Sequence, residues 1–492
     1  MRNIIIYILI LLSINTSSQS SYKIELVNSN RLISGPENSN YWICIGDVSF
    51  KHKENTMICD SSHLYIKDNQ INAFGNILLK HKDSLSIRAD KLVYYGDENK
   101  AYLSGNIVIN NNTMNLTTSN IEFDINKEII KYKKKGIIKD QNVNIKSNYG
   151  EYHIVDEIIY FKDSIILVSE DYNVLSDTLI YNNKTTSYFF FGPTNILAEE
   201  MKIYCENGYH NITSKISEFN QKSHIIDDSY SIKADSIYYD KTMRKGILKN
   251  NIYILNNTQD MIATGNLCEY FEKENKIKIT KNPIVYSISK EDTLTIKSNI
   301  VLYHEFKKNK YMIADKNVKI FSDNLQSICD SLYYSEKDSV IELYKSPKLW
   351  IDEIQVSSDT MQVFKKNKEI NRIEFISNPI IISESDSNYF DQIKGRYMIG
   401  FLKNKKIKKL NTIGNGESLF LIKDEDNIIG INKVKSSNIY INFNDNKIEN
   451  VSYTDNINSI TIPLKDINEE DKYLNGFKWS IEQRPIQQDF IE

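Results

Sequence analysis

The stretch SIRADKLVYY, residues 86–95, carries the pattern that decides the fold. Its small and apolar side chains alternate on one parity as far as Ala89, and on the other parity from Leu92 to Tyr94. Alternation with a period of two is typical of a β-strand. A slip of one residue predicts a corner, where a bulge resets the pleat and the same face stays inward. We expect Asp90, at the slip, to hydrogen-bond its own backbone there.

The same corner returns along the chain. Almost the same string, SIKADSIYYD, occupies residues 231–240. Its form is a small residue, then Asp, Asn or Ser, then an aliphatic and an aromatic residue at alternate positions. Copies recur at intervals close to 29 residues or multiples of it, with no clear copy near Glu206. The marker residues of these copies are Asp90, Ser119, Asn148, Asp177, Asp235, Asn299, Asp330 and Asp359.

A second marker lies between the corners and shares their period. It reads Gly-Asn or Asn-Pro followed by alternating aliphatic residues, and Gly46, Gly75, Gly105 and Gly136 are spaced by 29, 30 and 31 residues. Periods of this length indicate a repeat architecture. Two independent markers with one period predict an all-β, solenoid-like stack of repeats about 30 residues long.

The first 20 residues have the pattern of a secretory signal peptide. Arg2 precedes an apolar run at 4–14, and Ser18, Gln19 and Ser20 give a small-x-small end. The run is too short for a membrane span. No cysteine lies near Ser20 to carry a lipid anchor, and no later apolar run approaches 18 residues. We expect an exported protein without a transmembrane helix.

Composition points away from several classes of function. The formal net charge is −3, which favours neither nucleic acid nor a polybasic membrane contact. Five scattered cysteines have no metal-ligand spacing, although Cys44 and Cys59 could pair across neighbouring strands. No nucleophile elbow, phosphate loop or zinc motif is present in the sequence. One Asp per repeat indicates turn chemistry rather than paired catalytic carboxylates, so we expect neither an enzyme nor a cofactor.

The string AFGNILLKHKDSLSIRADKLVYYGDENKAYLSGNIVI, residues 73–109, resembles the repeat of the organic-solvent-tolerance (OstA) family. That family includes the periplasmic lipopolysaccharide-transport bridge LptA and the N-terminal domain of the outer-membrane translocon LptD. Residues 390–421 and 476–485 are similar to the longer OstA-like proteins of Bacteroidetes-type bacteria. The resemblance extends over roughly 40–485.

This resemblance implies an elongated, open β-jellyroll that holds the acyl chains of lipopolysaccharide in an apolar groove. It implies a periplasmic protein and leaves open whether that protein associates with the outer membrane. Its partners would be lipopolysaccharide and the inner- and outer-membrane jellyroll domains of the Lpt system, joined by edge-strand pairing, and end-to-end self-association would use the same edges. The expected divisions are a signal peptide (1–20), a lead-in (21–45), two jellyroll blocks (46–270 and 271–465) and a C-terminal tail (466–492).

The inward parity of the repeats around 85–123 supplies the candidate lipid contacts. Their role would be acyl-chain contact without chemistry. They are Leu85, Ile87, Leu92, Tyr94, Ile107, Ile109, Met114, Leu116, Ile121 and Phe123.

Two other interpretations stay open. A structural or adhesive solenoid would use the same inward residues to fill a closed core. A carbohydrate-active solenoid would need carboxylates clustered on adjacent rungs, whereas Asp and Glu fall mostly at corners and turns.

Overall fold

The computed structural model describes residues 22–491, except for 38, 83, 112–113, 141–142, 199–200, 259, 289–292, 307–308, 367–368, 387–388, 404–405, 426 and 445–446. The predicted signal peptide, 1–20, lies outside the described residues. Where the chain is described, its regular elements are β-strands and five short 3-10 helices, which confirms the predicted all-β fold. None of the described helices is long and apolar enough to span a membrane.

The chain divides into two compact units, Met1–Glu199 and Glu200–Glu492. The boundary between repeat blocks expected at 270/271 stays a prediction. A different change of construction occurs near it. Most rungs up to β20 (Met261–Phe271) are continuous strands, and many later rungs consist of two shorter strands.

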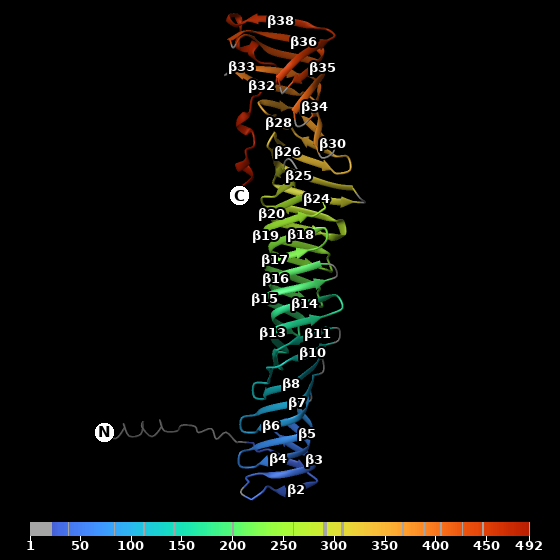
Figure 1. Cartoon of the computed structure of the whole chain (residues 1–492), viewed down its shortest axis with the longest axis vertical. Helices are drawn as coiled ribbons and strands as arrows, with labels where there is room; N and C mark the ends of the chain where they lie inside the picture. The colour runs from blue at the N-terminus through green and yellow to red at the C-terminus, as the bar shows by residue number, and fades with distance from the viewer. Residues whose placement is uncertain are drawn as a thin grey trace, which may run out of the picture. The chain divides into compact units, whose positions relative to one another are not determined.

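Unit 1 is a stack of antiparallel strands in which most strands pair with the next along the chain (Figure 1). The rung after β8 is divided, so β8 pairs with both β9 and β10. The strands are β1 (Glu25–Asn28), β2 (Arg31–Ser34), β3 (Trp42–His52), β4 (Asn55–Tyr65), β5 (Gln70–His81), β6 (Leu85–Tyr95), β7 (Lys100–Asn111), β8 (Met114–Asp124), β9 (Ile129–Tyr132), β10 (Gly136–Asp140), β11 (Val143–Ser147), β12 (Tyr149–His153), β13 (Ile158–Val168), β14 (Tyr172–Asn182) and β15 (Ser187–Ala198).

Unit 2 is a second antiparallel stack, followed by a C-terminal segment with 3-10 turns. Its strands are β16 (Met201–Asn211), β17 (Ile216–Ile226), β18 (Tyr230–Asp240), β19 (Lys245–Asn256), β20, β21 (Lys276–Thr280), β22 (Ile284–Ile288), β23 (Thr293–Lys297), β24 (Ile300–Phe306), β25 (Asn309–Ser322), β26 (Leu325–Ser335), β27 (Val340–Tyr344), β28 (Lys348–Ile351), β29 (Ile354–Ser357), β30 (Thr360–Lys366), β31 (Glu369–Ile376), β32 (Ile380–Asp386), β33 (Tyr389–Lys394), β34 (Tyr397–Lys403), β35 (Lys406–Asp424), β36 (Asn427–Asn444), β37 (Lys447–Thr454) and β38 (Asn458–Pro463). The 3-10 helices are η1 (Glu272–Glu274), η2 (Leu464–Asp466), η3 (Glu469–Lys472), η4 (Ile481–Gln483) and η5 (Gln487–Phe490).

The predicted corner is a β-bulge. The register of β5 and β6 shifts between Phe74 and Ile77. Gly75 and Asn76, both with positive φ, thereby oppose the single residue Asp90. Two residues against one is the bulge geometry that bends a strand and resets its pleat. The two sequence markers are therefore the two sides of one corner.

The corner aspartates bond the neighbouring strand, so the expectation that Asp90 bonds its own backbone is wrong. Asp90 Oδ2 accepts hydrogen bonds from the backbone N and from Nδ2 of Asn106, both at 3.0 Å. The reason is the left-handed bulge, which aims the Asn amide at the preceding rung. Gly105 (φ +98°) must lack a side chain, because a Cβ there would lie 2.3 Å from Asp90 Oδ2. The same pairing joins Asp60 to Asn76 and Asp235 to Asn251, each at 2.9 Å.

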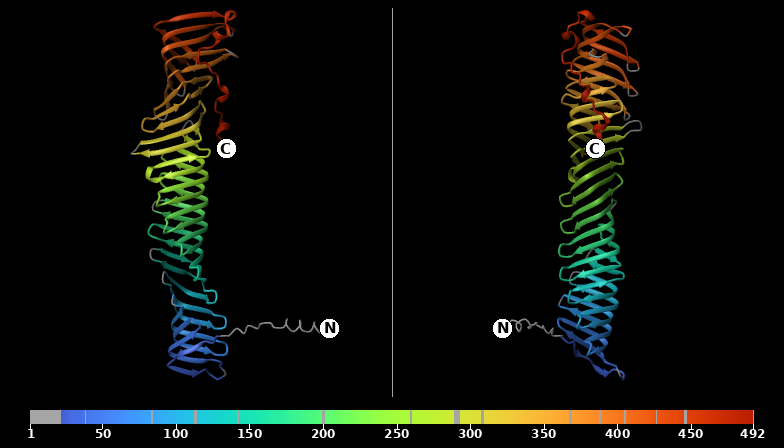
Figure 2. Two further views of the ribbon diagram at one scale, coloured as in Figure 1. Left: turned by 180° about the vertical axis from the view of Figure 1, so that it is seen from behind. Right: turned by 90° about the vertical axis from the view of Figure 1, so that its left-hand side faces the viewer.

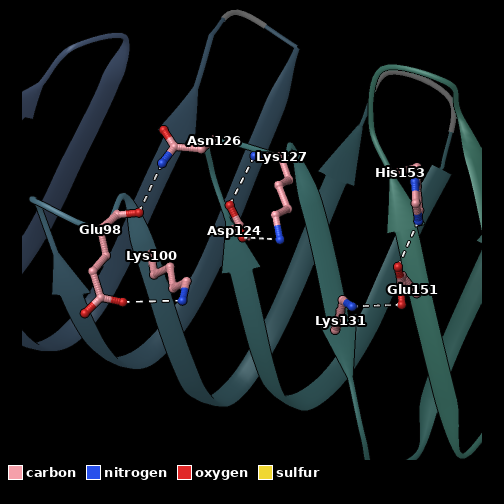
Figure 3. A network of polar contacts seen from close by, with 8 residues as sticks. All are labelled: Glu98, Lys100, Asp124, Asn126, Lys127, Lys131, Glu151 and His153. Carbon is pink, nitrogen blue, oxygen red and sulfur yellow. Dashed lines mark hydrogen bonds and ion pairs between the residues drawn. The ribbon is translucent and has the colours of Figure 1, made fainter. Parts of the chain in front are cut away.

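A third periodic feature lies in the hairpin turns. One residue per turn has positive φ, and its carbonyl accepts the N–H of the next turn, as in Gly96 N to Asn69 O (2.8 Å). Figure 3 shows the side-chain bonds near these turns, including the ion pair of Lys131 with Glu151 at 3.0 Å. These residues were missed because their types vary. They are Asn69, Asn99, Glu128, Glu157, Thr186, Lys215 and Arg244.

All five cysteines are buried and free in this structure, including Cys44 and Cys59. Burial raises the pKa of the Cys59 thiol to about 12, so it stays protonated at neutral pH. The Cys44–Cys59 disulfide that the sequence allows is not formed in this structure.

Candidate functional site

The ten predicted contact residues lie together on the inner face of β6, β7 and β8. Cross-strand neighbours such as Leu92 and Leu103, or Ile109 and Leu116, place them in one continuous layer. Their exposed fractions are between 0% and 5%. The predicted parity therefore agrees with the structure, and the interior here is closely packed. Contact with lipid at these residues stays a prediction.

The interior of unit 1 is closed by side chains that join its two edges. The first edge holds the turn at 53–54 and the turn residues 82 and 84, and the second edge holds the turns at 96–99 and 125–128. His52, at the first edge, and Tyr94, at the second, are hydrogen-bonded with Nδ1 and the hydroxyl 2.5 Å apart. Because strands bent at a corner bring their ends together, this bond spans the mouth of the interior.

The same closure repeats in the next rungs. One repeat on, the His81 ring packs edge-on against Phe123 with centroids 5.5 Å apart. Lys82 at the first edge pairs with Glu128 at the second. Another repeat on, Asn111 Nδ2 donates to the Tyr152 hydroxyl at 2.6 Å. We call these three contacts, His52–Tyr94, His81–Phe123 and Asn111–Tyr152, the cross-bridges.

The histidines of the cross-bridges are held in the neutral form. Burial lowers the pKa of both His52 and His81. His52 Nε2 lies 2.9 Å from the carbonyl of Tyr22, which can only accept. In the neutral ring Nε2 therefore carries the proton, and Nδ1 accepts from the Tyr94 hydroxyl.

The interior of unit 2 is more open. Tyr239, Tyr303 and Tyr334, which continue the inward aromatic series, are only half-buried, whereas Tyr94 and Tyr152 of unit 1 are buried. A cavity of about 960 Å³ lies inside unit 2, with lining residues that run from Thr258 to Leu402. Its lining is mainly apolar and includes Val285, Leu294, Ile296, Met312, Leu332 and Ile341.

A smaller apolar cavity of about 60 Å³ adjoins the first. Met261, Val285, Tyr303 and Met312 line both cavities. The apolar interior therefore continues from β18 to the strands that follow β30. An acyl chain fits a channel of this kind because burial removes its CH₂ groups from water.

Charged side chains lie at the rim of the large cavity. Lys310 and Lys365 occupy the inward parity at the edge of unit 2 that holds the turns at 272–275 and 336–339, beside the exposed Glu336 and Glu369. Asp260 contributes from the opposite edge of unit 2. Burial lowers the pKa of Lys365. Its ammonium lies 5.7 Å from the centre of the Tyr334 ring, a cation–π contact.

The C-terminal segment packs along the outer face of unit 2, as Figure 2 shows in red. Phe477 and Trp479 contact the ring of Phe390 at 5.1 and 5.3 Å between centroids. This contact was not predicted from the sequence, although aromatic residues in an otherwise polar tail are the signal that would have indicated it. Leu474 joins the same apolar cluster.

Two buried glutamines hold the segment by its backbone. Gln392 accepts from Leu474 N and donates to the Lys472 carbonyl, both at 2.8 Å. Gln355 bonds the backbone of Ser480 and Lys478 in the same way, at 2.8 and 2.7 Å. Each side-chain amide thus accepts one and donates one hydrogen bond to the segment's backbone, as the backbone of a neighbouring strand would.

The described residues contain no group of three or more His, Cys, Asp or Glu side chains placed to hold a metal ion. The geometry that they do contain is an apolar interior with a charged rim. This geometry is complementary to an amphiphile, with an apolar part and a charged part.

Comparison with known proteins supports the predicted resemblance for the N-terminal part of the chain. Residues 21–177 match the family model of the OstA-like proteins, which confirms the resemblance over this stretch. No curated protein matches the chain. One similar solved structure is LptH from Pseudomonas aeruginosa, described as the LptA homologous periplasmic component of the conserved lipopolysaccharide transport device. The match has 10% identity and a TM-score of 0.22, and it covers 23% of this chain and 94% of LptH.

Proposed function

We propose that this chain, whose residues 21–177 match the family model of the OstA-like proteins, is a periplasmic protein that binds and transports lipopolysaccharide. It binds the acyl chains in its apolar interior and catalyses no reaction. The observation that carries this proposal is the cavity of about 960 Å³ inside unit 2.

The physical basis is the transfer of hydrocarbon from water. Each CH₂ group that enters an apolar interior gains about 0.8 kcal/mol. A chain of a dozen such groups therefore gains roughly 10 kcal/mol before the costs of ordering it. Sugars and phosphates remain in water outside the rim.

The partners in this proposal are the inner- and outer-membrane jellyroll domains of the same transport system. Strands at the two ends of the chain expose apolar residues, including Leu32 on β2 and Ile460 on β38. Edge strands of this kind can pair with a strand of another protein. The same edges would allow end-to-end self-association.

A second candidate, a structural or adhesive solenoid, is favoured by the closed interior of unit 1. Its ten inward residues are at most 5% exposed, and the cross-bridges join its edges. A protein closed in this way throughout would not take up lipid.

The test is photo-crosslinking in exported protein, with a benzophenone residue at one position at a time. Met312 and Leu92 face inward in units 2 and 1, and Ile313 and Val93 are their outward neighbours. We expect a lipopolysaccharide adduct at Met312 and none at Ile313. An adduct at Leu92 but not Val93 would show that unit 1 opens as well.

The absence of lipid adducts at all four positions, in folded and exported protein, would overturn the proposal. The structural solenoid would then be the better description.

A further inference from the structure

Lys365 is a charged residue on the inward face of β30, in the lining of the large cavity. It is the third inward residue of β30, after Met361 and Val363. The cross-strand partners run from Tyr334 through Ile341 to Val363, so Val363 takes the place of the tyrosine of the preceding repeats. Lys365 lies six residues after the corner residue Asp359, where the two preceding repeats carry Glu305 and Glu336. At this rung a cation therefore replaces a carboxylate.

The immediate surroundings of Lys365 are apolar or aromatic. Ile370 is its cross-strand neighbour on β31, and Tyr334 lies beneath its ammonium. No ion pair of Lys365 occurs in the part of the chain that the structure describes. A half-buried cation with only a cation–π contact is incompletely compensated.

The acidic residues of the rim do not supply the missing partner. Glu336, Glu369 and Asp260 line the same cavity, but all three are exposed to solvent. Interactions between charges in water are screened, whereas those of a partly buried charge are screened much less. An anion that enters the cavity with an apolar chain would therefore interact more strongly with Lys365 than these exposed carboxylates do.

We infer that the cavity of unit 2 selects an amphiphile with an anionic group, phosphate or carboxylate, next to its acyl chain, and that Lys365 binds this group. This inference rests on the proposed function, since it names the class of ligand for the same cavity. Lys365 determines specificity, and the apolar lining supplies most of the affinity.

The experiment compares three ligands with the same chain: tetradecanol, myristate and tetradecyl phosphate. Each displaces the neutral fluorophore N-phenyl-1-naphthylamine from the full-length mature protein. We expect at least one of the two anions to bind about tenfold more tightly than tetradecanol, as one charged hydrogen bond would give. The preferred anion identifies the source, with phosphate indicating a lipid headgroup and carboxylate a free fatty acid.

Lys365→Met should remove the preference for the anion and leave the affinity for tetradecanol unchanged. Lys365→Arg should keep the preference. The matched control is Lys337→Met, because Lys337 is exposed on the same edge outside the cavity lining and its loss should change neither affinity.

The outcomes separate the inference from the proposed function. If all three ligands bind equally, or if Lys365→Met keeps the anion preference, the inference is wrong and lipid binding stands. If no ligand displaces the fluorophore, the proposed function fails for this cavity, and the inference falls with it.

Discussion

Single residues set both the corners and the closure of this fold. Gly105 is required by two constraints at once, its φ of +98° and the 2.3 Å approach of Asp90 Oδ2 to a hypothetical Cβ. His52 is required because a buried ring with a donor and an acceptor bridges the Tyr22 carbonyl and the Tyr94 hydroxyl. Neither role needs a ligand.

The first prediction concerns the corner. Gly105→Ala should lower the free energy of unfolding by about 1–3 kcal/mol, since it adds left-handed strain and pushes the Asp90 carboxylate from its bonds with Asn106. Urea unfolding followed by fluorescence measures the change. Gly246→Ala is the control, because its φ is ordinary and a Cβ there would meet Tyr270 at 3.5 Å. Equal losses in the two variants would contradict this account of the corner.

The second prediction concerns acid. Burial lowers the pKa of His52 and His81 in the folded protein below the ordinary value of a histidine, about 6.5. The unfolded chain therefore binds more protons, so stability is full above about pH 6.5 and is lost as the pH falls toward the folded pKa. Urea unfolding at pH 7.5 and pH 5 should show this loss.

His52→Gln cannot be protonated and should make the loss on acidification smaller, although it weakens the protein at pH 7.5. His63 is not part of a cross-bridge, so His63→Gln should keep the wild-type difference in the free energy of unfolding between pH 7.5 and pH 5. If the pH dependence of His52→Gln equals that of the wild type, the neutral cross-bridge is not its source.

At the scale of elements, periodicity predicted most of the strands, and contact chemistry could not be predicted. The slip in SIRADKLVYY predicted a bulge because alternation depends only on which face is buried. The bond between Asp90 and Asn106 was missed because it depends on the direction that the Asn106 side chain takes after Gly105, whose φ is positive. The turn residues with positive φ were missed because they are of different types. Glu128 and Thr186 adopt this conformation, and so does Asn69.

The third prediction concerns the C-terminal segment as an element. Gln355→Leu should leave the Ser480 N–H and the Lys478 carbonyl without partners, at a cost of about 1–3 kcal/mol for the buried groups. Limited proteolysis should then cut within 464–491 faster than in the wild type. Gln488→Leu is the control, since Gln488 is exposed on the same segment. Unchanged cleavage in Gln355→Leu would show that the apolar contacts of Phe477 and Trp479 hold the segment without the amides.

At the scale of the whole molecule, two units share one repeat pattern and differ in their interiors. Leu85 and Ile87 in unit 1 occupy the same repeat positions as Tyr230 and Ile232 in unit 2. The alternation of inward and outward residues is the same in both units, so the sequence pattern could not distinguish a packed core from a cavity. The difference lies in whether side chains at the two edges meet, as His52 and Tyr94 do.

The last prediction asks which unit takes up an acyl chain, and three methionines make it a matched test. Met261 lines both cavities of unit 2, Met114 faces the closed interior of unit 1, and Met243 is 71% exposed. Each is changed to Asn in the full-length protein. Met261→Asn should weaken tetradecanol binding about tenfold, because it places a polar amide where the chain would lie. Met243→Asn should change neither affinity nor stability.

Met114→Asn distinguishes the two descriptions of unit 1. If the interior stays closed, the variant loses about 1–3 kcal/mol of stability and binds tetradecanol as the wild type does. If its affinity falls while circular dichroism shows a folded protein, the cross-bridges must open to admit lipid. Leu85, Tyr94 and the other eight inward residues would then be contacts for the chain as well as core. Because unit 1 carries the OstA-like match, that result would place lipid in both interiors.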